Sequence, residues 1–140
     1  MKISDVMTPN PKTVKPTDSL QTAAQVMRDE DTGVVPVVEN GRVTGMVTDR
    51  DIVIRAIADG NYKARISDIV SDEVVTTMPD MPTSEAAELM SEHQIRRLPV
   101  VDGDDRLVGI VSLGDLAVKE KRDSRMGETL EHISEGVKRH

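Results

Sequence analysis

The chain of 140 residues carries the same sequence pattern twice, and this duplication limits its possible folds more than any other feature. When residues 3–38 are aligned with residues 66–101, 11 of the 36 positions are identical. One extra residue in the turn at 102–105 then shifts the offset, so that Asp51 aligns with Asp115. A unit of about 60 residues buries its apolar surface poorly when it is alone. We therefore expect the two copies to cover each other's apolar faces, with approximate two-fold symmetry.

Each copy predicts the same order of helices and strands. Residues 18–31 show apolar side chains at helical spacing (Leu20, Ala23, Ala24 and Met27), with Thr17 or Asp18 as the N-cap. The second copy predicts the matching helix over 82–93, with Pro82 in its first turn. Strands are predicted over 34–38, 43–47, 98–101 and 107–111, with a hairpin turn at Asn40-Gly41, and second helices near 50–58 and 114–121. This pattern, after a short extended lead-in, is typical of an α+β fold with α/β-like small sheets.

Charge and composition exclude several classes of protein. The 25 acidic and 18 basic residues give a net charge of −7, which argues against nonspecific binding to DNA or RNA. The absence of cysteine excludes a disulfide scaffold, thiolate catalysis, zinc ribbons and iron–sulfur clusters. No apolar run reaches the roughly 20 residues of a membrane span, and the N-terminus has no signal-peptide core. We expect a cytoplasmic protein that does not enter membranes.

A seven-residue pattern recurs at corresponding positions of the two copies, as Gly45–Asp51 and Gly109–Asp115. In each, a predicted strand ends at a hydroxyl residue, Thr48 or Ser112, and a helix begins directly after it. A helix N-terminus attracts phosphate, the hydroxyl can add a hydrogen bond, and the aspartate can accept from both hydroxyls of a ribose. The same Thr/Ser-x-x-Asp spacing also forms a capping box, which needs no ligand. Both interpretations stay open at the level of sequence.

The paired copies, the Pro-Val-Val strand and the recurring Gly-x-x-Thr/Ser-x-x-Asp pattern resemble the CBS-domain pairs, also called Bateman modules. The segments 48–54 and 93–100 are especially similar to small stand-alone members such as the hypoxia-response CBS-pair proteins. The resemblance divides the chain into a first CBS motif over 1–62, a second over 63–121, and a C-terminal tail over 122–140. It implies that each motif folds as β-α-β-β-α, that two motifs pack with pseudo-two-fold symmetry, and that adenosyl ligands bind in the clefts between them. Such pairs commonly form homodimers and regulate another protein.

The resemblance also implies roles for individual residues. Asp51 and Asp115 match the ribose-binding aspartate, and Thr48 and Ser112 match the hydroxyl residue that faces phosphate. The backbone of the lead-in segments reads the adenine edge, and aliphatic side chains form the walls of the adenine slot. The lead-in residues are Thr13, Val14, Thr76 and Thr77, and the wall residues are Val35, Pro36, Met46, Leu98, Pro99 and Ile110. Aliphatic walls agree with the composition, because Tyr62 is the only aromatic residue.

The two copies differ just before the strand that contains proline. The second copy has Arg96-Arg97 where the first has Gly33-Val34. Arginine side chains suit phosphate oxygens, so Arg96 and Arg97 are the foremost candidate phosphate ligands and Arg50 ranks below them. The alternative for Arg96 is a salt bridge with one of the many acidic residues. Without such arginines the first cleft is either empty or borrows them from the second copy.

Nothing in the sequence indicates an enzyme. No Ser-His-Asp arrangement, phosphate-binding loop or catalytic carboxylate pair is present, and His93, His132 and His140 lack the spacing of metal ligands. We expect a regulatory module that binds AMP, ADP or ATP, with S-adenosylmethionine and NAD ranked after them, and that acts on an unidentified partner protein. The alternative is a structural dimerisation module with empty clefts. In the tail, Met126, Leu130, Ile133 and Val137 recur at helical spacing, which predicts either an amphipathic helix that packs on a partner subunit or a solvated end.

Overall fold

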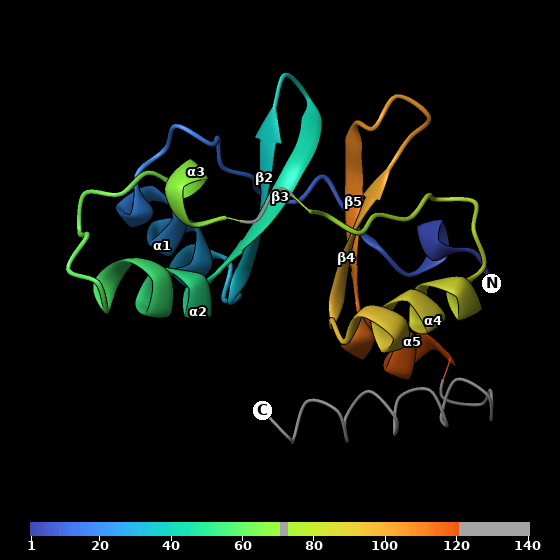
Figure 1. The fold of residues 1–140 in the computed structure, drawn as a ribbon. Coiled ribbons are helices and arrows are strands. Elements are labelled where there is room, and N and C mark those ends of the chain that lie inside the picture. The colour runs from blue at the N-terminus through green and yellow to red at the C-terminus, as the bar shows by residue number, and fades with distance from the viewer. Residues whose placement is uncertain (71–72, 121–140) are drawn as a thin grey trace. The chain divides into compact units, whose positions relative to one another are not determined.

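The computed structural model describes residues 1–70 and 73–120. The chain divides into two compact units (Figure 1). The first-repeat unit comprises Pro11–Val74, and the second-repeat unit comprises Met1–Asn10 together with Val75–His140. The segment for which the sequence predicts a C-terminal amphipathic helix lies outside the described residues.

The first-repeat unit contains a two-stranded antiparallel sheet and the helices that follow or precede it. Its elements are α1 (Leu20–Asp29), β2 (Val34–Glu39), β3 (Arg42–Thr48), α2 (Asp49–Asp51), η2 (Ile52–Ile57) and α3 (Ile66–Ile69). The β2–β3 turn has positive φ angles of 54° at Asn40 and 81° at Gly41, which confirms the predicted hairpin turn. Helix η2 continues α2 with wide turns, because the Ala58 N–H donates to the Val53 carbonyl at 2.9 Å, five residues back.

The second-repeat unit repeats this plan and adds one strand. Its elements are η1 (Ile3–Asp5), β1 (Thr8–Pro9), α4 (Thr83–His93), β4 (Arg97–Val101), β5 (Leu107–Ser112) and α5 (Leu113–Glu120). The sheet has the order β1-β5-β4, so that the N-terminal strand β1 lies beside β5. Helices and small sheets in both units confirm the predicted α+β class.

Three details of the predicted helices are wrong. The N-cap of α1 is Ser19 rather than Thr17 or Asp18, because the Ser19 hydroxyl accepts from the Thr22 N–H at 3.2 Å. Ala24 is exposed, whereas Ala23 is fully buried. The buried stripe of α1 is narrower than the sequence suggested, since successive helical residues are turned by about 100° and Ala24 lies outside the face that Ala23 buries. In α4 both aligned alanines, Ala86 and Ala87, are buried. In the second unit, Pro82 precedes α4 as its N-cap residue instead of lying in its first turn.

The compact units do not coincide with the sequence repeats, because a short helix of each repeat packs in the unit of the other. Helix η1 of the first repeat lies in the second-repeat unit, and α3 of the second repeat lies in the first-repeat unit. Ile3 of η1 is fully buried in the core of the second-repeat unit, beside Leu98 and Val111. Its counterpart in the alignment, Ile66 of α3, is fully buried in the core of the first-repeat unit. Backbone hydrogen bonds of 2.9 Å from Ile3 to Met81 and 3.0 Å from Ile66 to Asp18 fix these positions.

One polar side chain lies in the core without a partner. Thr77 is 5% exposed, and its hydroxyl has no hydrogen-bond partner among the described residues. The aligned residue of the first repeat is Val14, which is 2% exposed. A buried hydroxyl without a partner lowers stability, whereas a valine methyl group of similar size does not.

We therefore expect Thr77→Val to raise the free energy of unfolding by about 1–2 kcal/mol. The reciprocal control, Val14→Thr, places a hydroxyl in the equivalent core position and is expected to lower it by a similar amount. Urea unfolding measures both, with an unchanged m-value indicating an unchanged native fold. A loss of stability in Thr77→Val would contradict the assignment of an unpartnered hydroxyl.

Candidate ligand-binding site

The first-repeat unit has a capping box where β3 passes into α2. The Thr48 N–H donates to Asp51 Oδ2 at 3.1 Å, and the Asp51 N–H donates to Thr48 Oγ1 at 3.0 Å. The second oxygen of the carboxylate, Asp51 Oδ1, lies 3.6 Å from Arg55 Nε. We call Thr48–Asp51 the first-repeat corner.

The second-repeat unit has the same arrangement where β5 passes into α5. The Ser112 N–H donates to Asp115 Oδ2 at 3.0 Å, and the Asp115 N–H donates to Ser112 Oγ at 3.0 Å. Among the residues whose side chains the structure describes, none pairs with Asp115 Oδ1. We call Ser112–Asp115 the second-repeat corner. The capping interpretation of the recurring motif is confirmed in both units, and each aspartate keeps a second oxygen that the cap does not use.

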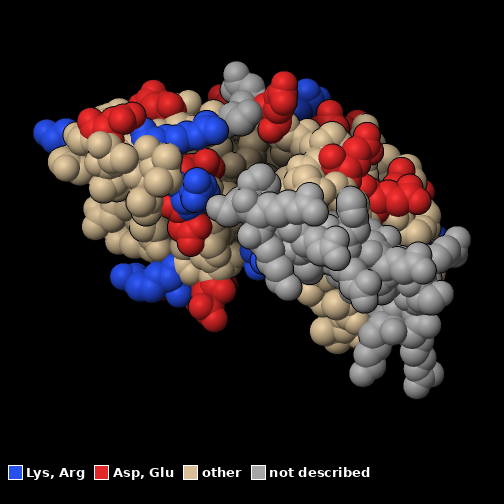
Figure 2. All heavy atoms as spheres, turned by 60° about the horizontal axis from the view of Figure 1, so that its bottom comes forward, with Lys and Arg blue, Asp and Glu red and all other residues tan. Residues whose placement is uncertain are grey.

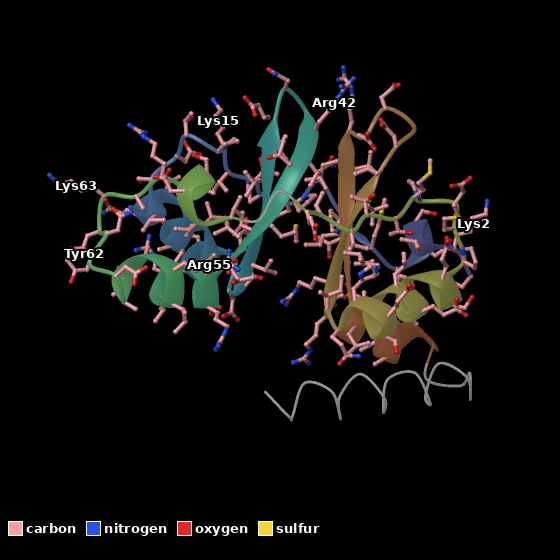
Figure 3. The ribbon with its side chains drawn as sticks, viewed as in Figure 1. Lys2, Lys15, Arg42, Arg55, Tyr62 and Lys63 are labelled. Carbon is pink, nitrogen blue, oxygen red and sulfur yellow. The ribbon has the colours of Figure 1, made fainter. Side chains whose placement is uncertain are left out.

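Arg55 contacts the first-repeat corner and is a residue that we did not predict. Its guanidinium is half exposed and lies beside the end of β3 (Figure 3), where it pairs with Asp51. Its Nη1 also donates to the Ile69 carbonyl at 3.2 Å, so the side chain links the corner to α3. The sequence contained a signal for it, because an acid and a base four residues apart on a helix commonly pair.

The strand register sorts the predicted wall residues between two faces of each sheet. In the first-repeat unit Pro36 lies opposite Met46, and Val34 lies opposite Thr48, on one face. Val35 alternates to the other face and is buried in the core. In the second-repeat unit Pro99 pairs with Ile110 and Arg97 with Ser112, while Leu98 lies in the core. The register thus brings the hydroxyl residues together with Pro36, Met46, Pro99 and Ile110, and separates the side chains of Val35 and Leu98 from them.

The lead-in segments use only half of their backbone groups in the sheets. The Val14 N–H donates to the Pro36 carbonyl at 3.0 Å, and the Val14 carbonyl accepts from Val38 at 2.8 Å. Thr77 forms the equivalent bonds with Pro99 and Val101, at 3.1 and 2.8 Å. Backbone groups of the preceding residues, Thr13 and Thr76, have no partner among the described residues. They form a short open edge, which can accept a planar ligand with hydrogen-bonding groups.

Arg97 is the first residue of β4 and Arg96 directly precedes the strand, and both side chains are exposed. Neither forms an ion pair with a described residue, so the structure gives no support to the salt bridge considered for Arg96. Arg97 is the direct cross-strand neighbour of Ser112, so its side chain leaves the sheet on the same face as Ser112 of the second-repeat corner. Arg50 is also exposed, in the first-repeat corner.

Asp102, whose pKa is shifted, lies apart from the corners. The N–H groups of Asp104 and Arg106 hold the pKa of Asp102 below its usual value, but Asp102 is in the β4–β5 turn, at the opposite end of the hairpin from Ser112. Tyr62 is 70% exposed in the loop after η2 (Figure 3). On the face shown in Figure 2, described Lys and Arg side chains are interspersed with Asp and Glu. In the described part of the chain, no three acidic or histidine side chains are grouped to hold a metal ion.

Comparison with known proteins identifies both halves of the chain. The profile of the CBS domain matches residues 3–57 and 66–120. The CBS domain-containing protein YhcV of Bacillus subtilis is 44% identical over 133 residues, with 94% of each chain covered. Hypoxic response protein 1 of Mycobacterium tuberculosis is 37% identical over 116 residues, which cover 81% of this chain and 80% of that protein. The predicted similarity to stand-alone hypoxia-response proteins is confirmed.

Solved structures agree with this assignment. The CBS domain pair of protein MJ0100, in complex with 5′-methylthioadenosine and S-adenosylmethionine, has a TM-score of 0.78 and 29% identity, with 86% of this chain and 96% of that chain covered. CBSX2 in complex with AMP has a TM-score of 0.75 and 26% identity, with 86% of this chain and 96% of that chain covered.

Within the described residues, no helix combines the length and the apolar character that crossing a bilayer requires.

Proposed function

Since the chain belongs to the CBS domain family and carries two CBS motifs in tandem, we propose that it is a regulatory module that binds an adenosyl ligand. AMP, ADP and ATP are the preferred candidates, ahead of S-adenosylmethionine and NAD. The observation that carries the proposal is the recurrence of one corner in both units, each with an aspartate oxygen outside the capping box. The complexes of related CBS pairs with AMP and with S-adenosylmethionine support this ligand class.

Each part of the ligand has a matching group in the second-repeat unit. Asp115 Oδ1 accepts from the ribose hydroxyls, while Oδ2 is held by the Ser112 N–H and fixes the carboxylate in place. The Ser112 hydroxyl and the guanidinium groups of Arg96 and Arg97 bind phosphate. Pro99 and Ile110 contact the faces of the adenine, and the open backbone edge at Thr76 binds its polar edge. The first-repeat unit offers Asp51, Thr48, Pro36, Met46 and Thr13 in the equivalent roles, with Arg50 as its candidate phosphate ligand, since Arg55 already pairs with Asp51.

We also propose that the protein acts as a homodimer in the cytoplasm, without catalysis, and transmits ligand binding to another protein by a shift between two conformations. Val53, Ile54 and Ile57 support association, because these three large apolar side chains of η2 are 44–54% exposed. This exposed face also favours the alternative function, a structural dimerisation module that binds no ligand. A chain without cysteine has no need of an oxidising compartment, which supports the cytoplasmic location.

A thermal-shift panel of AMP, ADP, ATP, S-adenosylmethionine and NAD tests the proposed function. A ligand at 100 times its Kd is expected to stabilise the protein by about 2.7 kcal/mol. Asp115→Ala and Asp51→Ala should each lower the stability of the free protein by about 0.5–2 kcal/mol through the lost cap, and Asp115→Ala should also abolish the nucleotide-dependent shift.

Two further acids of this chain provide matched controls. Asp5 accepts from the Lys2 N–H at 3.0 Å and Asp68 accepts from the Arg65 N–H at 2.9 Å, so each belongs to a capping box outside the corners. Asp5→Ala and Asp68→Ala should lower stability to a similar extent but keep the ligand-dependent shift. The proposal fails if no compound in the panel stabilises the protein, and the structural dimerisation module is then favoured.

A further inference from the structure

The two corners differ in the way that they use the N–H groups at the helix start. In the first-repeat corner all four are bonded within the protein. Thr48 and Asp51 form the capping box, the Asp49 N–H donates to the Gly33 carbonyl at 2.9 Å, and the Arg50 N–H donates to Asp49 Oδ1 at 2.8 Å. A carboxylate of the protein itself therefore occupies the donor position that an anionic ligand would use.

The second-repeat corner leaves the equivalent donor open. Ser112 and Asp115 form the capping box, and the Leu113 N–H donates to the Arg96 carbonyl at 2.8 Å. Gly114, which aligns with Arg50, is exposed, and its N–H has no partner among the described residues. Leu113, which aligns with Asp49, is buried and brings no negative charge.

Charge at the neighbouring position reinforces this difference. The Asp49 carboxylate lies over Gly33, with Oδ2 3.0 Å from the point where a larger residue at 33 would have its Cβ. Arg96 is the equivalent residue in the second-repeat unit, because it accepts the same hydrogen bond through its carbonyl. The first-repeat corner thus carries a carboxylate next to this position, whereas in the second-repeat unit the aligned residue is an arginine with an exposed side chain. Arg55 does not reverse this, since it already pairs with Asp51 at 3.6 Å.

We propose that Asp49 determines ligand specificity by occupying the phosphate position of the first-repeat corner. This corner then takes an adenosyl ligand without phosphate, and the second-repeat corner takes the phosphorylated ligand. The inference rests on the proposed function, because it assigns different ligand classes to two corners of one kind. Repulsion between the Asp49 carboxylate and a phosphate adds to the loss of the Arg50 N–H as a donor.

AMP and adenosine are suitable probes, because they differ only in the phosphate. Amide NMR titrations of the full chain report separately on Thr48–Asp51 and Ser112–Asp115. In the wild-type protein AMP should bind the second-repeat corner roughly tenfold or more tightly than the first-repeat corner, the equivalent of one charge-assisted hydrogen bond. Asp49→Asn should raise the AMP affinity of the first-repeat corner by roughly tenfold and leave adenosine binding there unchanged.

Asp59→Asn is the matched control, because it removes the same charge from an exposed position beyond η2 and should not change AMP binding. Equal AMP affinity at the two wild-type corners would overturn the role of Asp49 while leaving the proposed function intact, as would an Asp49→Asn variant that behaves like Asp59→Asn. If neither AMP nor adenosine perturbs either corner, both the proposed function and the role of Asp49 are refuted.

Discussion

Replacing Ile3 with alanine is expected to lower the free energy of unfolding by about 2–5 kcal/mol, although the residue is only three positions from the N-terminus. Ile3 is fully buried in the core that contains Leu98, Val100 and Val111. Alanine removes most of this side chain and leaves a cavity that the surrounding helices and strands fill only in part. Chemical denaturation measures the loss.

Native-state hydrogen exchange locates the effect of Ile3→Ala. Protection should fall in β4 and β5, which belong to the same compact unit as Ile3, and remain higher in β2 and β3. Ile66→Ala is the reciprocal control, because Ile66 is buried in the core of the first-repeat unit and should reduce protection in β2 and β3. Loss of protection confined to β2 and β3 in Ile3→Ala would refute the assignment of the N-terminal segment.

The double substitution Arg96→Gln with Arg97→Gln is expected to weaken AMP binding by roughly 100-fold, since each charge-assisted hydrogen bond contributes about tenfold. Both side chains are exposed and without an ion pair among the described residues, so the variant should fold normally. Isothermal titration calorimetry with AMP and with adenosine separates the phosphate contribution from that of the nucleoside. Adenosine affinity should not change.

Arg106→Gln provides the control for this pair. Arg106 is an exposed arginine of the same unit, next to the β4–β5 turn and at the far end of the hairpin from Ser112. Its removal should leave AMP affinity within about twofold of wild type, as for a surface charge more than a Debye length from the ligand. An equal loss of AMP affinity in Arg106→Gln and in the double variant would show that general positive charge, and not a phosphate contact, is responsible.

Much of the architecture was predictable because the relevant signals are local. The Asn40-Gly41 turn needs positive φ angles, which asparagine and glycine tolerate, and strand segments rich in valine on both sides define the hairpin. The capping boxes follow from a hydroxyl residue and an aspartate three positions later, and the sequence also offered them as a ligand site. Because the chain is duplicated, each local pattern occurs twice, and the two copies support the same prediction of structure.

Features that depend on contacts distant in the sequence were not predictable. The position of Ile3 in the core of the second-repeat unit is set by packing against residues almost a hundred positions away. Asp49 was treated as a variable position of the motif, because nothing in the sequence indicates that its carboxylate folds back onto the Arg50 N–H over Gly33. That the side chains of Val35 and Pro36 lie on opposite faces of the sheet could have been predicted, since adjacent residues of a strand face opposite sides.

Helices η1 and α3 each pack in the unit of the other repeat, and this has a consequence for any ancestor that consisted of one repeat. Such a chain would begin with a helix whose isoleucine, the equivalent of Ile3 or Ile66, packs in the core of another repeat. Its own core would lack the isoleucine that this position requires. It could finish its core only by taking that segment from a sister molecule, which is domain swapping between identical chains. Gene fusion would have joined the two copies covalently, so that each obtains the segment it needs from within the same chain. It would also have fixed the ratio of the two halves at one to one.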